Sequence, residues 1–166
     1  MSGSSNVDRS AAGQASQLEA ERSEALFRGV FEGSLEALML LTERGFFECN
    51  ARALQVFGVA SREAFLAMHP SDASPPVQPD GRPSLEAAQE HIARALREGS
   101  CEFEWVHRRA SGEDFPAAVR LSSIERDGSK VLLAAVSDLS ARKQAEREAQ
   151  QSAERLQRSE RFYRGI

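Results

Sequence analysis

The residues of this sequence that could do chemistry are three histidines and two cysteines. His69 is expected in a loop, His91 on a helix flank and His107 on a strand, and no nucleophile motif lies near any of them. A glycine-rich loop for phosphate groups is also absent. Cys49 and Cys101 have neither metal-ligand spacing nor the density of a disulfide framework. We therefore expect no enzyme activity, no metal site and two reduced cysteines that serve in packing.

The size and charge of the chain limit what it can be. Its 166 residues, 41% of them hydrophobic, suffice for one core of about 100 to 130 residues with extensions. A net charge of −4, spread along the chain, leaves no basic stripe, so we expect no nucleic-acid partner. No apolar run approaches the roughly 20 residues of a membrane span, and the N-terminus lacks the regions of a signal peptide. We expect a cytoplasmic location and no membrane segment.

The side chains that could line a site are carried by strands in the second half of the chain. Residues 101–108 and 115–121 alternate largely apolar with polar side chains, which predicts strands with one dry and one wet face. Turn residues follow at 110–113 and 126–129. The next run, 131–136, is apolar on both faces, so we expect it at the centre of a covered sheet.

The beginning of the chain is expected to contain a tail, a helix and two strands. Residues 1–17 are small and polar, which predicts a flexible tail. Residues 18–33 follow the pattern of an amphipathic helix. After a Gly-Ser break, strands are expected at 37–41 and 46–49.

Short helices and one loop should follow these strands. Asn50 can cap a short helix at 51–58, and Ser61 can begin a second one. Five prolines make residues 69–83 an irregular loop, and such loops commonly form one wall of a pocket. A longer helix is expected at 85–98.

Several segments, in this order and spacing, resemble a PAS sensor domain. The segments are residues 50–54, 74–81, 107–116 and 136–143, the last with an Asp-Leu-Ser step like the Asp-Ile-Thr ending of that family. The resemblance covers about residues 25–143, and we place the domain at 34–140. It implies an α+β fold with a five-stranded antiparallel sheet in the order 2-1-5-4-3 and helices over one face. That order makes neighbours of 37–41 and 131–136, the two runs that are apolar on both faces.

The sheet face opposite the helices needs a cover. One candidate is the apolar stripe of the preceding helix, and another is a second copy of the domain. We therefore predict a homodimer whose interface includes Ala25, Leu26, Val30 and Phe31.

A ligand cavity, if the fold has one, would lie between the sheet and the helices, and about half of the candidates for its lining should be plain core residues. The candidates for its lining are apolar and aromatic: Phe47, Leu54, Phe57, Phe65, Ile92, Leu96, Phe103, Trp105, Val119 and Leu133. Asp138 ends the last strand, and we expect it to relay a signal to the next helix by pairing with Arg142 or a neighbouring amide.

Two cofactors of the family deserve comparison with this sequence. Some members ligate haem iron from the helix before the third strand, where His91 lies about 90° from the centre of the apolar face. Blue-light flavin members carry a reactive cysteine where this chain has Ala51, so covalent flavin photochemistry is not expected. We expect no cofactor, with haem and non-covalent FAD as the alternatives.

The C-terminal segment is almost entirely made of helix formers. Residues 141–160 place small side chains and one leucine at heptad spacing, at positions 145, 149, 152, 156 and 159. This pattern fits a solvated single helix or a parallel two-helix signalling linker, and we favour the linker. Residues 159–166 resemble residues 23–30, which indicates either coincidence or the start of a truncated second PAS-like repeat.

Together these patterns predict a sensory and dimerisation module of a signal-transduction protein. The remaining partners would be a downstream PAS-like domain, a possible small-molecule ligand and an output domain: a two-component histidine kinase, a chemoreceptor or a cyclic-dinucleotide enzyme. One alternative is a structural dimerisation module without a ligand. Another is a haem- or flavin-binding sensor of gas or redox state.

Overall fold

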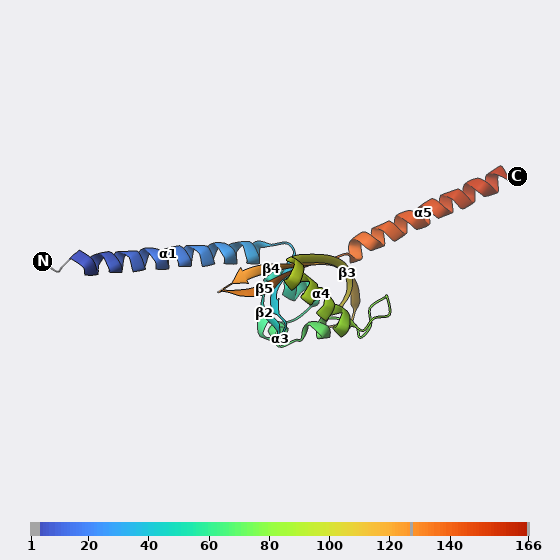
Figure 1. Cartoon of the computed structure of the whole chain (residues 1–166). Helices are drawn as coiled ribbons and strands as arrows, with labels where there is room; N and C mark the ends of the chain where they lie inside the picture. The colour runs from blue at the N-terminus through green and yellow to red at the C-terminus, as the bar shows by residue number, and fades with distance from the viewer. Residues whose placement is uncertain (1–3, 127, 166) are drawn as a thin grey trace. The chain divides into compact units, whose positions relative to one another are not determined.

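The centre of the fold is a five-stranded antiparallel sheet (Figure 1). We describe a computed structural model that covers residues 4–126 and 128–165. The strands are β1 (Ala37–Thr42), β2 (Gly45–Cys49), β3 (Ser100–Arg108), β4 (Asp114–Arg126) and β5 (Ser129–Asp138). Their spatial order is β2-β1-β5-β4-β3, which confirms the predicted order.

Burial along the strands follows from this order. On β4 the alternating residues Phe115, Ala117, Val119 and Leu121 are buried, as expected for a strand with one covered face. The central strand β5 lies between β1 and β4, and most of its residues from Val131 to Val136 are buried. The central position therefore explains why this run is apolar on both faces.

Short helices and one longer helix follow β2 and precede β3. They are α2 (Ala51–Phe57), α3 (Arg62–Leu66), the 3-10 helix η1 (Pro70–Ala73) and α4 (Ser84–Glu98). Fully buried Asn50 begins α2 as predicted: its Oδ1 accepts from the Ala53 amide at 2.9 Å and from the Leu38 amide at 3.0 Å. One side chain thus caps the helix and joins it to β1. Gly58 ends α2 with φ 67°, a left-handed conformation that favours glycine.

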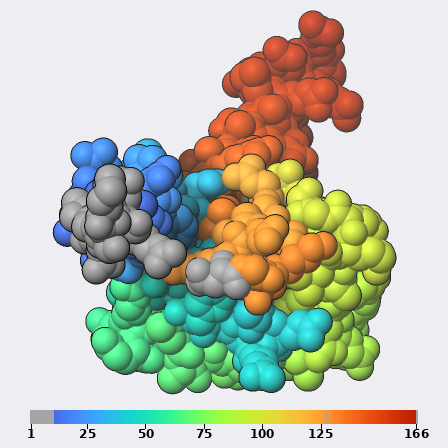
Figure 2. Space-filling view, turned by 60° about the vertical axis from the view of Figure 1, so that its left-hand side comes forward, coloured from blue at the N-terminus to red at the C-terminus, as the bar shows by residue number. Residues whose placement is uncertain are grey.

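The turn between β1 and β2 lies beside the beginning of β5. Leu41 pairs with Leu132 across the strands, and Figure 2 shows the cyan and orange segments next to each other. An open surface hollow of about 740 Å³ lies between them, with Thr42 and Lys130 on its walls. This hollow faces solvent and is distinct from the interior cavity described below.

The helix α1 (Ser4–Gly33) belongs to a compact unit of its own, residues 1–35. It begins at Ser4, whereas the sequence predicted a flexible tail through residue 17. The three Ala and two Gln residues of 11–17 have good intrinsic helix propensity and need no buried partner to adopt this conformation. Of the predicted interface residues, Leu26 and Val30 are 70% and 67% exposed, Ala25 is exposed, and Phe31 is buried.

The last helix, α5 (Ser140–Arg164), contains no buried residue. Its surface carries hydrogen bonds between residues four apart, such as Arg142 to Glu146 at 2.9 Å and Gln144 to Glu148 at 2.8 Å. The predicted linker 141–160 lies within α5, and its heptad positions are exposed. The predicted repeat begins within α5, but its last residue, Ile166, lies outside the described residues.

Candidate functional site

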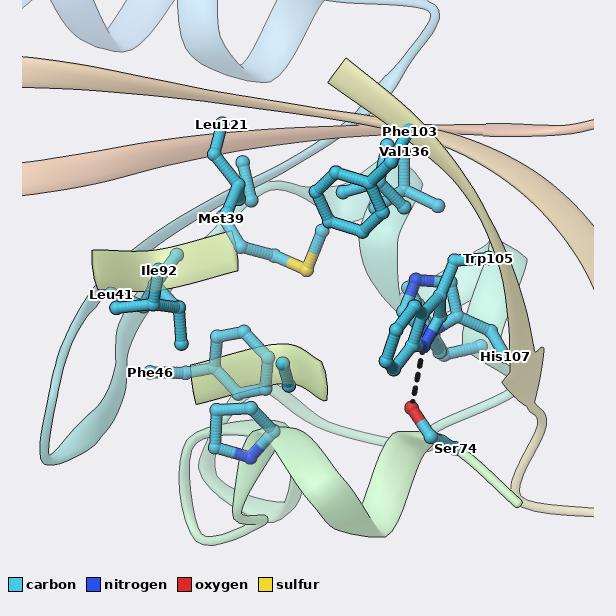
Figure 3. Close-up of a pocket in the computed structure, with 15 residues that line it drawn as sticks. Met39, Leu41, Phe46, Ser74, Ile92, Phe103, Trp105, His107, Leu121 and Val136 are labelled. Carbon is cyan, nitrogen blue, oxygen red and sulfur yellow. Dashed lines mark hydrogen bonds between the residues drawn. The ribbon is translucent and has the colours of Figure 1, made fainter. Parts of the chain in front are cut away.

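An apolar cavity of about 70 Å³ lies between the sheet and the helices. Figure 3 shows the labelled side chains converging on it from both layers. Fifteen residues line it: Met39, Leu41, Phe46, Phe57, Pro70, Ser74, Ala88, Ile92, Phe103, Trp105, His107, Val119, Leu121, Ala134 and Val136. None of these fifteen carries a carboxylate, an ammonium or a guanidinium group. The lining therefore favours a neutral and mostly apolar occupant.

Two residues bring polar groups to this lining. The Trp105 indole N–H donates to the Ser74 hydroxyl at 2.9 Å, the dashed line in Figure 3. His107 Nδ1 lies 2.9 Å from the Ala73 carbonyl oxygen. A carbonyl oxygen can only accept, so Nδ1 must carry a proton. Burial lowers the pKa of His107 to about 4, outweighing the bond to Ala73, so the ring is neutral at pH 7 and Nε2 has no proton.

Five of the ten predicted lining residues do line the cavity. They are Phe57, Ile92, Phe103, Trp105 and Val119. Fully buried Phe65 packs behind the wall, with its ring 5.6 Å from that of Phe57, and Leu54 packs against the core from α2. Both residues therefore support the cavity without bordering it.

The other three predicted residues lie elsewhere. Phe47 and Leu96 border the surface hollow beside the β1–β2 turn, and Phe47 is 39% exposed. Its neighbour Phe46 faces the cavity, because successive residues of a strand point to opposite faces. The same rule explains Leu133, which is only half-buried while its neighbour Ala134 lines the cavity.

The sequence-based prediction missed most of the wall contributed by β1 and β5. Met39, Leu41, Ala134 and Val136 line the cavity but were read only as core strand residues. A signal for them existed, since the predicted strand order and the two-residue period together assign one face of each central strand to the helices. Ser74 and His107 had no such signal because their roles depend on distant partners.

Asp138, the predicted relay residue, pairs with Arg109. Their side chains meet at 2.5 Å, and the other Asp138 oxygen accepts from the Ser140 amide at 2.8 Å. Burial acts to raise the pKa of Asp138, but hydrogen bonds from Arg109 and Ser140 outweigh it and hold the pKa below its usual range. Of the two predicted alternatives, Arg142 is not the partner, because it pairs with Glu146. The predicted contact with a neighbouring amide is present.

Arg109 connects several parts of the domain through one guanidinium group. It donates to the Val56 carbonyl at the end of α2 and lies 3.2 Å from a Glu113 carboxylate oxygen. Its Cζ lies 4.0 Å from the centroid of the Phe115 ring, a cation–π distance. Sequence inspection missed this residue, because its partner Asp138 is 29 positions away.

His91, the predicted haem ligand, does not line the apolar cavity. Its ring stacks on Phe103 at 3.6 Å between centroids and borders a separate groove that contains Arg82 and Lys143. Burial lowers the pKa of His91, with the nearby charge of Arg94 as a further cause. The His91 ring therefore belongs to an aromatic stack with Phe103 beside this groove.

The cavity does not fit haem or a flavin. Pockets for ligands of drug size measure roughly 300 to 1,000 Å³, several times the volume found here. Ala51, where the flavin proteins carry cysteine, is exposed on the first turn of α2.

Cys49 and Cys101 are free and buried, and neither is among the residues that line the cavity. Within the described ranges, no three His, Cys, Asp or Glu residues are grouped to hold a metal ion.

Across residues 4–126 and 128–165, none of the helices has both the length and the apolar character needed to cross a bilayer.

Comparisons with known proteins agree with this architecture. The family model "PAS domain" matches residues 35–141. A PAS domain of a two-component sensor histidine kinase is 19% identical with a TM-score of 0.55, covering 74% of this chain and 98% of its own. The PAS domain of an HTR-like protein from Haloarcula marismortui is 17% identical with a TM-score of 0.60, and the shares are 75% and 98%.

A light-oxygen-voltage protein from Rhodobacter sphaeroides is also similar. It is 22% identical with a TM-score of 0.54, over 68% of this chain and 64% of that protein. No curated protein sequence matches the chain. At these identities the solved structures establish the fold, and the family model covers well over half of the sequence. The chain therefore belongs to the PAS domain family.

Proposed function

We propose that this domain senses a small molecule in its cavity and relays the occupied state to α5. PAS domains are sensory and signalling modules and are mostly non-catalytic. We further propose that the chain works as a homodimer, joined to a second PAS-like domain and to a kinase, chemoreceptor or cyclic-dinucleotide output domain. The observation that carries the proposal is an unbroken series of contacts from the cavity wall to the first turn of α5.

The series begins in the aromatic cluster behind the cavity. The rings of His107 and Phe115 are 5.8 Å apart, and Phe57 contacts both, at 5.0 and 5.7 Å. Phe115 is fully buried, so a shift of His107 has to be absorbed by these neighbours. The cluster therefore couples the cavity wall to the ring that Arg109 covers.

The second half of the series is polar. Arg109 lies on the Phe115 ring and holds the Asp138 carboxylate, which in turn accepts from the Ser140 amide at the beginning of α5. The Leu139 amide also donates to the Pro116 carbonyl at 2.8 Å. A displacement of the β3–β4 hairpin would thus be transmitted to the start of α5 by direct contacts.

Replacement of Asp138 by Ala tests this route. The variant should exchange the amide hydrogens of residues 140–144 at least about fivefold faster, because a charge-assisted hydrogen bond is lost. Asp114→Ala is the matched control, since Asp114 forms a similar ion pair with Arg108, at 2.6 Å, that includes no residue of α5. Equal exchange at the start of α5 in both variants, measured by hydrogen–deuterium exchange, would refute the relay.

The dimer proposal is supported by the exposed apolar side chains of α1. Leu26 and Val30 lie four residues apart and are mostly exposed, so a second copy would bury both. The double variant Leu26→Glu/Val30→Glu should weaken association at least tenfold in sedimentation experiments. Leu18→Glu, at a half-exposed position on the same helix, serves as control. A chain that sediments as a monomer at every concentration would overturn the dimer.

A ligand-free structural module is the second candidate, and the small volume of the cavity favours it. Mass spectrometry of the denatured protein separates the two candidates, because a resident small molecule would be released and detected. An absorption spectrum of the same sample tests for haem or flavin, which absorb visible light.

A further inference from the structure

His107 Nε2 is the unusual atom of the cavity wall. Two buried side-chain nitrogens among the described residues have no hydrogen-bond partner, His91 Nδ1 and His107 Nε2, and of these two residues only His107 lines the cavity. The His107 ring lines the cavity. It forms ring contacts with Phe57, Trp105 and Phe115. The side chains of these three neighbours contain one N–H group, that of Trp105, and it already donates to Ser74. Buried polar groups in folded proteins are nearly always paired, so an unpaired one on a cavity wall calls for an explanation.

The bond on the other side of the ring decides what Nε2 can do. Because Nδ1 donates to the Ala73 carbonyl at 2.9 Å, the neutral ring has its lone pair on Nε2. Nε2 is therefore a hydrogen-bond acceptor. Nε2 has almost no surface open to a water-sized probe, so a donor in the cavity reaches it only when the side chains around it shift, whereas a molecule that only accepts leaves it unpaired.

The rest of the lining restricts the donor to a small class. The volume of about 70 Å³ compares with about 30 Å³ for one water molecule in the liquid, so a molecule of a few non-hydrogen atoms fits. The apolar walls provide no counter-charge for an ion. A water molecule could also donate to Nε2. It would, however, offer no apolar group to contact the apolar side chains that line the rest of the cavity.

From these observations we propose that His107 Nε2 is the ligand anchor of the cavity, and that its ligands are small neutral molecules with one hydroxyl donor and a short apolar chain. Short-chain alcohols are the simplest members of this class. The inference rests on the proposed sensory function, because it specifies the ligand of the same cavity.

A pair of isomers tests the anchor. 1-Propanol and ethyl methyl ether contain the same atoms, but only the alcohol can donate a hydrogen bond. Trp105 is the single tryptophan of the 166 residues and lines the cavity, so its fluorescence reports binding in this chain. We expect the alcohol to bind about 3- to 10-fold more tightly than the ether, the range of one net hydrogen bond.

Substitution of the histidine should remove this preference. His107→Phe keeps an aromatic ring but has no acceptor, so the two isomers should bind with equal affinity. His91→Phe, which changes a histidine outside the cavity lining, should retain the preference. Equal binding of the isomers by the unmodified protein, no binding of either, or a preference that survives in His107→Phe would each overturn the proposal.

A measurement on the unmodified chain covers the case in which His107→Phe does not fold. The ¹⁵N resonance of His107 Nε2 should shift on saturation with 1-propanol, and that of Nδ1 should hardly move. An unchanged Nε2 resonance would contradict the anchor. These results are independent of the relay, which is judged by exchange in α5 of Asp138→Ala, so either proposal can fail alone.

Discussion

The two faces of the β3–β4 hairpin use the same residue types in different ways. On its outer face Arg108 pairs with Asp114 at 2.6 Å, and both side chains are more than one-third exposed. On its inner side Arg109 pairs with Asp138 and also contacts Val56 and Phe115. The outer pair closes a hairpin locally, whereas the inner pair joins α2, the hairpin and the start of α5. Position in the fold, and not the residue type, therefore separates a surface ion pair from a candidate relay.

The largest difference between the two faces should appear in acid. Above pH 6.5 His107 is neutral in both the folded and the unfolded chain, so its contribution to stability is complete. As the pH falls towards about 4, the unfolded chain takes up the proton first, and stability is progressively lost. From pH 8 to pH 5 we expect a loss of about 2 kcal/mol from this residue.

Urea unfolding of the unmodified chain and of His107→Phe at both pH values measures this loss. His91 is present in both proteins, so its contribution cancels in the comparison. The outer face of the hairpin has no buried histidine that could cause a similar loss of stability in acid. The same pH dependence in both proteins would show that His107 is not held neutral.

A smaller effect should come from the arginines themselves. Arg109→Ala should lower the free energy of unfolding by about 2 kcal/mol, because a partly buried Asp138 and a backbone carbonyl both lose a charged donor. Arg108→Ala should have a much smaller effect, because its partner stays in contact with water. Urea midpoints compare the two variants directly, and equal midpoints would remove the distinction drawn above.

The smallest difference should be the response to salt. Raising the ionic strength from about 0.1 to 1 M shortens the Debye length from about 10 to 3 Å and screens exposed charges most. The coupling between Arg108 and Asp114 in a double-mutant cycle should therefore fall more than that between Arg109 and Asp138. A greater loss at the inner pair would indicate that Asp138 is more open to solvent than the structure has it.

Much of the fold could be predicted because its signals are local. The alternation of residues 115–121, the capping by Asn50 and the left-handed Gly58 depend on neighbours within a few positions, and all three are present in the structure. The strand order followed from the family resemblance together with the two strands that are apolar on both faces. The N-terminal tail was a poorer prediction, since polar composition alone does not prevent a helix.

The candidate site was only partly predictable. Aromatic residues such as Phe103 and Trp105 were recognised from size and alternation, but Phe47 was chosen where its neighbour Phe46 faces the cavity. Within a short hairpin strand with two adjacent aromatic residues, the pattern does not say which of them points inward. Arg142 was chosen as the relay partner because it is close in sequence, whereas Asp138 meets a residue on another strand.

The sequence by itself determined the strands, the caps, the apolar runs and the absence of a nucleophile motif, because these depend on short-range spacing and residue type. The tertiary structure alone decided which side chains meet. It places the Ala73 carbonyl on His107 Nδ1 and Arg109 on Asp138, across 34 and 29 positions of the chain. Hydrogen bonds across such separations form only when the sheet brings distant segments together, and they assign His107 its tautomer and Asp138 its partner.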